Sequence, residues 1–360
     1  MKKTIFSLTI ALLTLASCSS TESDPIEIPT VGATLNPEVG GPNQPNQVYL
    51  DLSTGKSEVV NRETWDFGFA TGTDFRVIIN GSLKMAVKKL ETSDITAPQE
   101  IDTKITVGQG DVASTTGYVD NPTGVLTGNG QGIGTAIAEV SANDADNKVY
   151  LVNMGFAVST EKPAKGAVNV YGAARGWKKV RVLRNANGYK IQYADLASTT
   201  FQERTIAKDD NFNFTFFSIK AEKTVTVEPL KSKWDLNFTT FTNYVNFGSE
   251  VLYGYSDFVI SNRKGGTQVY EVLVADQITY EGFVLSHVDP SKFEISKTDQ
   301  RIIGGNWRSG GGPSSLPSIK TDRFYIVKDE ANNNYKVKFL TMTNDAGERG
   351  NPVLEYALLK

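Results

Sequence analysis

A single cysteine carries the most specific chemistry in the sequence. Cys18 is the only cysteine in 360 residues, so no disulfide can form within the chain. It ends the segment Leu15-Ala16-Ser17-Cys18, which has the order of a lipobox, in which the cysteine thiol takes a diacylglycerol. Lysines and an apolar run from Ile5 to Leu15 precede it, and that run is too short to span a bilayer core of about 30 Å. We therefore expect residues 1–17 to be a signal peptide and Cys18 to be acylated.

The acyl chains predict where the mature protein resides. Each buried methylene contributes about 0.8 kcal/mol, so two or more chains form a stable membrane anchor. Ser19, rather than an aspartate, follows the cysteine and favours the outer membrane or cell surface. The membrane is thus the first expected partner.

The other reactive residue types exclude several classes of function. His287 is the only histidine, so a zinc site with two or more His or Cys ligands is excluded, and no Gly-x-Ser-x-Gly elbow accompanies it. The glycine-rich segment Gly128–Gly134 lacks a clear βαβ unit around it and is interpreted as a loop. The acidic turns 143–147 and 209–211 lack the EF-hand spacing and are interpreted as solvated turns. With a net charge of −3 and no basic run, no nucleic-acid partner is expected.

Composition divides the chain into a tether and a folded body. Residues 18–46 are rich in Ser, Pro, Asn and Gly, and such a segment cannot bury enough apolar surface to offset the entropy of ordering. We expect a disordered tether there. More than 300 residues follow, which is enough for two domains or one large all-β domain.

The body reads as all-β, with mostly antiparallel sheets. Turn-formers such as Asn185–Gly188, Lys208–Asn211 and Asn332–Asn334 separate runs of β-branched and aromatic residues. The expected strands are Gln47–Leu52, Phe75–Ile79, Lys148–Val152, Val180–Leu183, Tyr189–Tyr193, Phe212–Ile219, Thr224–Val227, Phe324–Val327 and Tyr335–Phe339. Short helices are expected only at Leu83–Leu90 and Thr135–Val140.

An internal echo indicates two related β-rich units. The segment Glu63–Phe69, which contains Trp65-Asp66, returns as Ser232–Phe238, which contains Trp234-Asp235. The strand, turn and strand of 180–193 return at 324–339. We therefore expect an N-terminal unit at 47–219 and a C-terminal unit at 220–360, with coincidence among β-rich segments as the alternative.

Six segments of the body carry a pattern that is found elsewhere: Phe214–Ile219, Val227-Glu228-Pro229, Lys233–Phe238, Ser261-Asn262, Asp322–Asp329 and Tyr335–Phe339. Together they resemble the HmuY-type haem-binding lipoproteins of Bacteroidetes. The resemblance is clearest over residues 180–360. It implies an all-β binding protein without catalysis, located at the outer membrane or cell surface. It also implies haem bound on loops of one face, for delivery to a TonB-dependent receptor.

The chain departs from that family at the iron. The best-known haem-binding member holds iron between two histidines, whereas this chain has only His287. Some relatives use methionines, and the mature chain offers Met85, Met154 and Met342. Met and His are both competent axial ligands, so His287 and Met342 are the expected metal ligands, with Met154 as a further candidate. The alternatives are a strand core position for Met154 and a turn position for His287.

Aromatic segments offer a second kind of binding. Tyr244–Gly248, Tyr253–Tyr255 and the loop Gly304–Pro313, with Trp307 and Arg308, would suit stacking on a flat ring, with Arg308 pairing a propionate; a sugar would suit them equally well. Two hypotheses follow. The first is a membrane-anchored lipoprotein that captures haem for a TonB-dependent receptor. The second is a surface interaction or glycan-binding scaffold that has lost haem ligation.

The anchor is tested by replacing its cysteine. The Cys18→Ala variant should remain an unacylated precursor and no longer partition with membranes, because the thiol is the acceptor of the diacylglycerol. Metabolic labelling with a fatty acid, followed by membrane fractionation, measures both properties. Label that persists in the variant would contradict the assignment.

Overall fold

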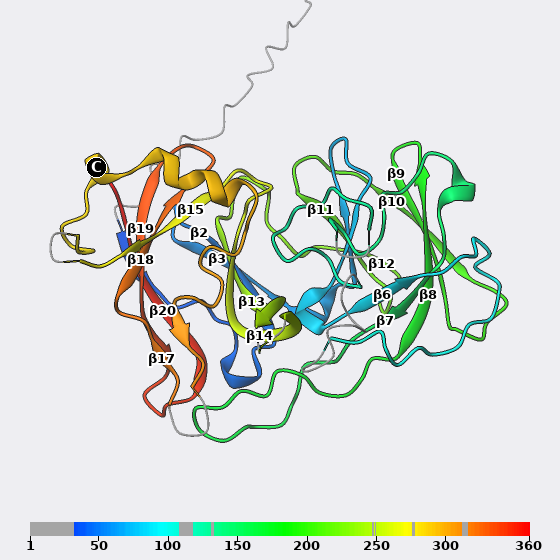
Figure 1. The fold of residues 1–360 in the computed structure, drawn as a ribbon, viewed down its shortest axis with the longest axis horizontal. Coiled ribbons are helices and arrows are strands. Elements are labelled where there is room, and N and C mark those ends of the chain that lie inside the picture. Colours follow the sequence, from blue (N-terminus) through cyan, green and yellow to red (C-terminus); the bar gives the residue numbers. More distant parts are fainter. Residues whose placement is uncertain are drawn as a thin grey trace, which may run out of the picture.

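The computed structural model describes residues 32–107, 118–130, 133–246, 248, 250–275, 278–311 and 316–360, which form two β-rich lobes side by side (Figure 1). Cys18, the predicted signal peptide and the first part of the predicted tether lie outside the described residues. Within the described part of the chain, no helix is long and apolar enough to cross a membrane.

The first lobe is a five-stranded sheet packed on a four-stranded sheet. The larger sheet has the order β10-β9-β8-β7-β6, and the smaller has the order β12-β11-β4-β5. The strands are β4 (Phe67–Ala70), β5 (Val77–Ile79), β6 (Ala86–Lys89), β7 (Tyr150–Asn153), β8 (Trp177–Asn185), β9 (Gly188–Ala194), β10 (Gln202–Ala207), β11 (Phe214–Ser218) and β12 (Lys223–Val225). One hydrophobic cluster, which includes Phe67, Val180 and Ile191, fills the space between the two sheets.

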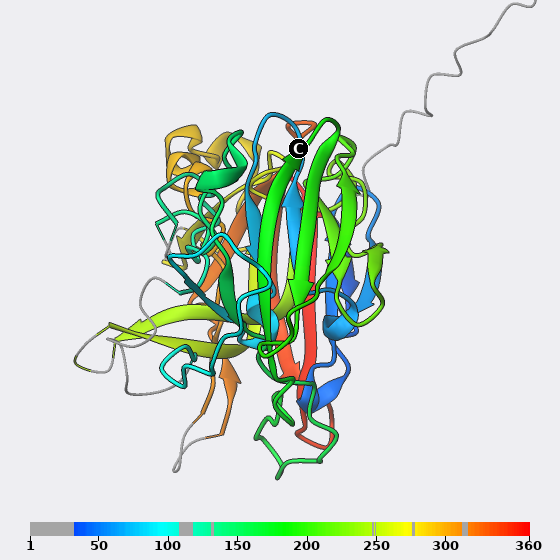
Figure 2. The same cartoon turned by 90° about the vertical axis from the view of Figure 1, so that its right-hand side faces the viewer.

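The second lobe repeats this layout. Its larger sheet has the order β1-β20-β19-β18-β15, and its smaller sheet has the order β14-β13-β2-β3. The strands are β1 (Gly32–Leu35), β2 (Asn46–Asp51), β3 (Lys56–Asn61), β13 (Leu236–Asn246), β14 (Glu250–Ser261), β15 (Gln268–Leu273), β18 (Arg323–Lys328), β19 (Asn334–Thr343) and β20 (Arg349–Leu358), with a small pair β16 (Arg308–Ser309) and β17 (Ser318–Ile319). The β13–β14 hairpin, yellow-green in Figure 2, reaches out to one side.

The helical elements among the described residues are short 3-10 turns. They are η1 (Gly41–Asn43), η2 (Arg62–Thr64), η3 (Gly81–Leu83), η4 (Asp144–Asp146), η5 (Leu285–His287) and η6 (Pro290–Lys297). The strand pairs described are antiparallel, so the prediction of an all-β, mostly antiparallel fold is confirmed.

Alternation of side chains explains why the strand predictions succeed. In β19, Tyr335, Val337 and Phe339 point into the core, whereas Lys336 and Lys338 lie on the outer face. Such a period of two is what a half-buried strand requires. Every strand expected from this pattern overlaps a strand in the structure.

The two helix predictions are wrong. Residues 86–89, inside the expected helix Leu83–Leu90, form β6 and pair with β7, so that Ala86 lies opposite Asn153. Residues 135–140 form bends and irregular backbone. In β6 the burial of Ala86 and Val87 between layers outweighs local helix propensity.

The N-terminal segment departs from the expected tether and unit boundary. Residues 32–35, expected to be disordered, form β1 and pair with β20. Gln44, also expected in the tether, is buried and exchanges two hydrogen bonds with Asp257, at 2.7 and 2.9 Å. The strands β2 and β3, expected in the N-terminal unit, belong to the sheet of β13 in the second lobe. Partners far along the chain thus order a segment whose composition alone predicts disorder.

Each tryptophan-aspartate segment clamps a neighbouring strand in the same way. In the first lobe, the Asp66 backbone N–H donates to the carbonyl of Phe217 at 2.9 Å, and its carboxylate accepts from the Ile219 N–H at 2.7 Å. In the second lobe, the Asp235 N–H donates to the carbonyl of Leu50 at 2.7 Å. Its carboxylate accepts from the Leu52 N–H at 2.9 Å. The sequence echo therefore reflects an equivalent structural role.

An asparagine completes each clamp. The Asn80 side-chain amide donates to the carbonyls of Arg62 and Trp65, both at 2.8 Å. The Asn262 amide donates to the carbonyls of Lys231 and Trp234, at 2.7 and 2.8 Å. Buried polar groups are almost always hydrogen-bonded. These amides satisfy backbone carbonyls at each tryptophan and in the turn that precedes it.

A buried arginine joins the lobes. Arg62 is fully buried, and its guanidinium donates to the carbonyls of Gln44 and Ser82 at 2.6 Å each, and of Val170 at 2.8 Å. Burial lowers the pKa of Arg62 to about 10, so the side chain stays charged at neutral pH. Arg62 therefore connects the turn before β2 to η3 and to the first-lobe loop that contains Val170.

The two tryptophans allow a matched test of this framework. Both are buried in one cluster between the lobes, so Trp65→Ala and Trp234→Ala should each cost about 3–5 kcal/mol. Trp65 Nε1 donates to Gln47 Oε1 at 2.8 Å, whereas the structure gives Trp234 Nε1 no hydrogen-bond partner. Trp65→Phe should therefore cost about 1–3 kcal/mol more than Trp234→Phe, because it leaves Gln47 unpaired. Urea unfolding measures the difference, and equal losses would contradict it.

Candidate functional site

The structure does not bring the predicted iron ligands together. Met154 is buried in the first-lobe core and Met342 in the second-lobe core, each at most 3% exposed. His287 is exposed on η5, with its ring centre 5.5 Å from that of Phe283, which belongs to a third cluster. Haem ligation by any of these residues stays a prediction.

Trp307 and Arg308, the predicted stacking and propionate-binding residues, contact other residues of the second lobe. The Trp307 indole is 1% exposed, stacks on Phe339 with ring centres 4.3 Å apart, and donates to the carbonyl of Asp257. Arg308 donates to the carbonyls of Asp257 and Ser256. Both side chains therefore support the backbone of β14 at Ser256 and Asp257, where the register of the β13–β14 pair shifts. Their role in ligand binding stays a prediction.

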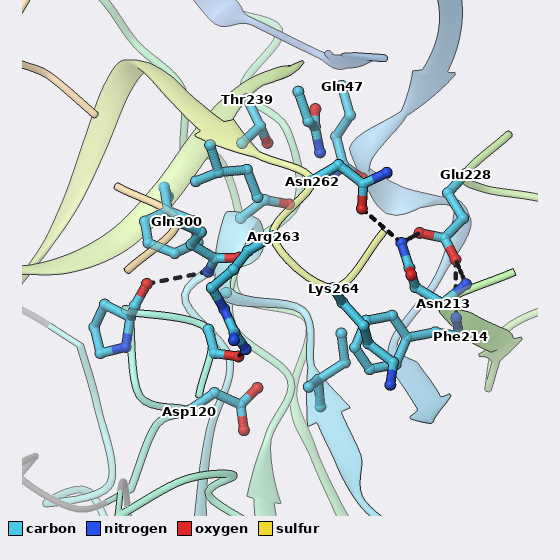
Figure 3. A pocket seen from close by; sticks show the side chains of 18 of the residues that line it. Gln47, Asp120, Asn213, Phe214, Glu228, Thr239, Asn262, Arg263, Lys264 and Gln300 are labelled. Carbon is cyan, nitrogen blue, oxygen red and sulfur yellow. Dashed lines mark hydrogen bonds between the residues drawn. The ribbon is translucent and has the colours of Figure 1, made fainter. Parts of the chain in front are cut away.

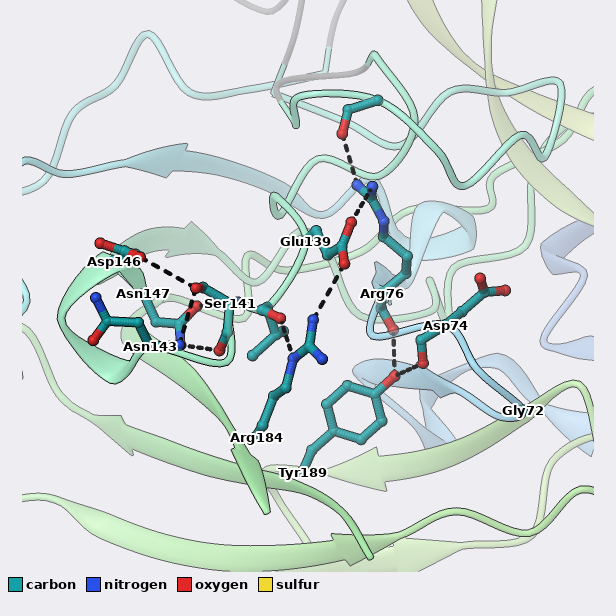
Figure 4. A network of polar contacts seen from close by, with 12 residues as sticks. Gly72, Asp74, Arg76, Glu139, Ser141, Asn143, Asp146, Asn147, Arg184 and Tyr189 are labelled. Atoms are coloured by element: carbon teal, nitrogen blue, oxygen red, sulfur yellow. Dashed lines mark hydrogen bonds and ion pairs between the residues drawn. The ribbon is translucent and has the colours of Figure 1, made fainter. Parts of the chain in front are cut away.

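Hydrogen bonds occupy some of the side-chain oxygens of the acidic turn at 143–147 (Figure 4). The Asn147 side chain accepts from the Ser141 N–H at 2.7 Å and donates to the Ser141 carbonyl at 2.9 Å. The Ser141 hydroxyl donates to Asp146 at 3.2 Å. Among the described residues, no group of three or more His, Cys, Asp or Glu is placed to hold a metal ion.

An open groove lies on the second lobe, beside the β13–β14 hairpin. This aromatic groove, of about 620 Å³, is lined by residues that include Asn243, Tyr255, Phe258, Tyr270, Lys292 and Arg301, together with the loop Gly304–Asn306. The ring centres of Phe258 and Phe241 are 4.8 Å apart in a stacked pair, and Tyr255 lies 5.5 Å from Phe258. Tyr255 and the 304–306 loop were both predicted from sequence, and the fold places them at one groove.

Most charges in the aromatic groove are already paired. Arg301 forms an ion pair with Asp299 at 2.8 Å. Glu271 forms one with Arg323 at 2.9 Å. Lys292 is exposed at the rim, with Nζ 5.8 Å from the centre of the Tyr270 ring. The groove therefore offers flat apolar walls and one accessible cation.

A second cavity, the inter-lobe pocket, opens between the two four-stranded sheets (Figure 3). Its volume is about 160 Å³. Trp65 and Phe216 of the first lobe line it together with Tyr49 and Trp234 of the second lobe. Both clamp tryptophans thus form its walls, and the pocket exists only where the two lobes meet.

Contacts across the lobes hold the rim of the inter-lobe pocket. Gln300 of the second lobe donates through its side chain to the carbonyl of Pro122 at 3.0 Å. The Arg263 guanidinium donates to the carbonyls of Gly124 and Lys297. The loop 121–124 of the first lobe is therefore tied to the second lobe at the pocket.

Polar atoms without partners gather at the inter-lobe pocket. Of the residues that line it, four have a buried polar atom for which the structure gives no hydrogen-bond partner: Asn213 Oδ1, Trp234 Nε1, Asn237 Oδ1 and Arg263 Nε. Two of these atoms are acceptors and two are donors. Buried polar atoms are rarely left unsatisfied, so this set indicates a place for a polar molecule.

Burial raises the pKa values of two carboxyl groups that line the inter-lobe pocket. Glu228 Oε1 accepts from the N–H groups of Asn213 and Phe214, at 2.6 and 2.8 Å. Burial nevertheless raises the pKa of Glu228 to about 7, although these hydrogen bonds oppose the rise. Burial also raises the pKa of Asp120 to about 7, against the N–H groups of Ala136 and Ile79. Both acids are near their midpoints at neutral pH.

Sequence reasoning did not predict the inter-lobe pocket. The repeated tryptophan-aspartate segment is visible in the sequence. Its local pattern does not indicate that the two tryptophans line the same cavity. Asn213 lies in an expected strand and Asn237 lies in the repeated segment Ser232–Phe238, but neither position marks a binding role in the sequence. Only the repeat itself could have pointed to this place.

Comparison with known proteins gives one family. A model of the HmuY protein family matches residues 43–356. No curated protein matches the chain. Among solved structures, a crystal structure of a candidate lipoprotein from Bacteroides fragilis NCTC 9343 is similar, at 10% sequence identity over 50% of this chain and 90% of that chain, with a TM-score of 0.17. At that TM-score the likeness carries no argument about fold or function.

The perturbed acid predicts a pH-dependent stability. A carboxyl group whose pKa is about 7 when folded and 4.5 when unfolded stabilises the protein fully below pH 4.5, and this contribution is lost as the pH rises through 7. Between pH 5 and 8, wild type should lose about 2–3 kcal/mol more stability than Glu228→Gln, which cannot ionise. Urea unfolding at both pH values measures this, and parallel profiles would refute it.

Proposed function

The chain belongs to the HmuY family, and from that premise we propose that it is a membrane-anchored lipoprotein that binds haem or a related tetrapyrrole in the aromatic groove. The family is one of binding proteins, and the proposed role is ligand capture rather than catalysis. The proposed location is the outer membrane or cell surface, with Cys18 as the acylated residue. Delivery of the ligand to a TonB-dependent receptor completes the proposal.

The aromatic groove is the observation that carries the proposal. Its volume of about 620 Å³ lies within the range of about 300–1,000 Å³ that is typical of sites for drug-sized molecules. Half-buried Tyr255 gives it an accessible ring, whereas Phe258 is only 2% exposed, and aromatic rings favour offset stacking on another ring system. A planar macrocycle suits an open groove of this kind better than a compact ligand does.

Charge supports an anionic ligand. Because the groove acids Asp299 and Glu271 are already paired, Lys292 is the cation best placed at the rim to meet a propionate. An exposed ion pair contributes at most about 1 kcal/mol and weakens with salt. Lys292 would therefore orient the ligand more than hold it.

The donor set of the groove favours binding through the ring rather than through iron. Its lining, as far as the chain is described, includes the hydroxyls of Tyr255 and Tyr270 but neither histidine nor methionine. Tyrosine oxygen is a known axial ligand of haem iron, although burial raises the pKa of both tyrosines and so disfavours a phenolate. Stacking and the rim cation would then supply most of the affinity.

The second candidate is a surface interaction or glycan-binding scaffold that has lost haem ligation. The separate positions of Met154, Met342 and His287 favour it. Under this alternative the fold of the family is kept, while the aromatic groove or another surface recognises a glycan or a partner protein.

Titration with haem and with its iron-free analogue distinguishes binding through the ring from binding through the iron. The described elements lie within residues 32–358, so the chain from Ser19 to Lys360 is titrated with haem and with protoporphyrin IX, and the Soret band is followed. Binding through the ring predicts similar affinities for the two. Tyr255→Ala should weaken both by about five- to 150-fold, because stacking of one ring contributes about 1–3 kcal/mol. Lys292→Ala should weaken them by a few fold, more at low salt.

Ligand variants provide the matched comparison. His287→Ala, Met154→Ala and Met342→Ala are titrated with haem in the ferric and ferrous states. If a methionine ligates iron, affinity rises on reduction and is lost in the matching variant, since thioether ligands favour ferrous iron. If these variants match wild type while Tyr255→Ala does not, the groove assignment stands. Failure of wild type to bind either tetrapyrrole would overturn the proposal in favour of the scaffold.

A further inference from the structure

We infer that the inter-lobe pocket is a second binding site, which takes one uncharged sugar ring, either a free monosaccharide or the terminal residue of a glycan. The inference rests on residues that line this pocket and on none of those in the aromatic groove. It is therefore independent of whether the groove binds a tetrapyrrole.

The unpartnered atoms define the hydrogen-bonding requirement. Asn213 and Asn237, which are 2% and 3% exposed, present carbonyl oxygens that need a donor. Trp234, 7% exposed, presents an indole N–H that needs an acceptor, and Arg263 Nε–H needs another. A hydroxyl group can both donate and accept. A ligand with several hydroxyls therefore offers both the donors and the acceptors that atoms of these kinds require.

The charges favour a neutral ligand. Glu228 and Asp120 would repel an anion whenever they are ionised, and Arg263 and Lys264 would repel a cation. Desolvating an ion inside a partly buried pocket adds a further cost. A polyhydroxylated molecule meets neither penalty, and the two acids can donate or accept according to their protonation.

The walls suit a ring with an apolar face. Trp65 and Phe216 pack edge to face with ring centres 4.9 Å apart, and Tyr49 and Trp234 pack similarly at 5.0 Å. Phe214 adds a further ring, 6.0 Å from Phe216. These side chains give an apolar surface next to the polar atoms. A pyranose ring combines C–H faces with an equatorial rim of hydroxyls and so matches both.

Size separates this ligand from a tetrapyrrole. The pocket volume of about 160 Å³ lies below the range of about 300–1,000 Å³ for drug-sized ligands. It corresponds to roughly five water molecules at about 30 Å³ each in the liquid. One small ring fits, whereas a porphyrin does not.

The pocket can be reached from outside and depends on both lobes. Lys264 is exposed at its rim, whereas Asn213 is buried in its interior. Figure 3 shows the Asn213–Glu228 pair on one side and Gln300 on the other. A ligand bound here would contact both lobes and should raise the melting temperature of the whole body.

The test uses the full-length acylated protein in detergent micelles. D-glucose, D-galactose and N-acetyl-D-glucosamine are each titrated to about 50 mM, which saturates a site with a Kd of about 1 mM. Saturation-transfer NMR follows binding, because it does not depend on tryptophan fluorescence. At least one sugar should bind saturably and raise the melting temperature. Methyl glycosides form the second arm: equal binding indicates the terminal residue of a glycan, and binding of free sugars only indicates a monosaccharide.

Two variants locate the site. Trp234→Phe keeps an aromatic ring, though a smaller one, and removes the unpartnered N–H, and Asn237→Ala removes an unpartnered acceptor. Each should weaken sugar binding about tenfold. Trp177→Phe, the same change away from the pocket, should bind like wild type. If Trp234→Phe does not fold, Asn237→Ala decides. Absence of saturable binding in wild type would mean that the pocket holds water only, and binding unchanged in both variants would place the sugar elsewhere. Either result overturns the inference.

Discussion

Two buried aspartates, Asp66 and Asp235, clamp the strands on which both lobes depend. Each donates its backbone N–H to a neighbouring strand and accepts an N–H from the same strand two residues later. In the first lobe the clamped strand is β11, which comes late in the same part of the chain. In the second lobe it is β2, near the start of the chain, and Leu52 and Asp235 are 183 residues apart. Asp66 and Ile219 are 153 residues apart, so both clamps close a long loop at an entropic cost, and the second lobe closes only when the N-terminal strands have returned to it.

This closure determines how the lobes meet. Because β2 and β11 occupy equivalent places, the outer faces of the two four-stranded sheets confront each other and bring both tryptophans into one cluster. Arg62 fastens the junction through three carbonyls from separate segments. The interface between the two four-stranded sheets leaves the inter-lobe pocket unfilled, and polar residues beside the clamps are among those that line it. The inter-lobe pocket is thus a product of the repeat, and neither lobe could form it alone.

The two candidate binding regions differ in kind. The aromatic groove belongs to the second lobe, is open, and has paired acids and one cation at its rim, which suits a flat anionic ligand. The inter-lobe pocket is small and has buried donors, acceptors and acids, whose pKa values burial raises to about 7. Occupation of the groove would leave the contacts between the lobes unchanged, whereas occupation of the pocket would strengthen them. A lipid-anchored protein with both would present one ligand at its surface and hold another within its body.

Local patterns in the sequence determined the class of the fold and most of its strands, because alternation along a strand such as Tyr335–Phe339 depends only on residues near one another. The repeated tryptophan-aspartate segment likewise predicted that the two segments have equivalent roles in the two lobes. The family that the sequence resembles is also the family whose model matches residues 43–356. The pairing of β1 with β20 and of β2 with β13 was decided by the tertiary structure, as was the strand at Ala86–Lys89. So were the separation of Met154 from Met342 and the meeting of Trp65 with Trp234. These features depend on the free energy of contacts between residues that are far apart in the chain. The spacing of residues within one short segment contains no information about such contacts.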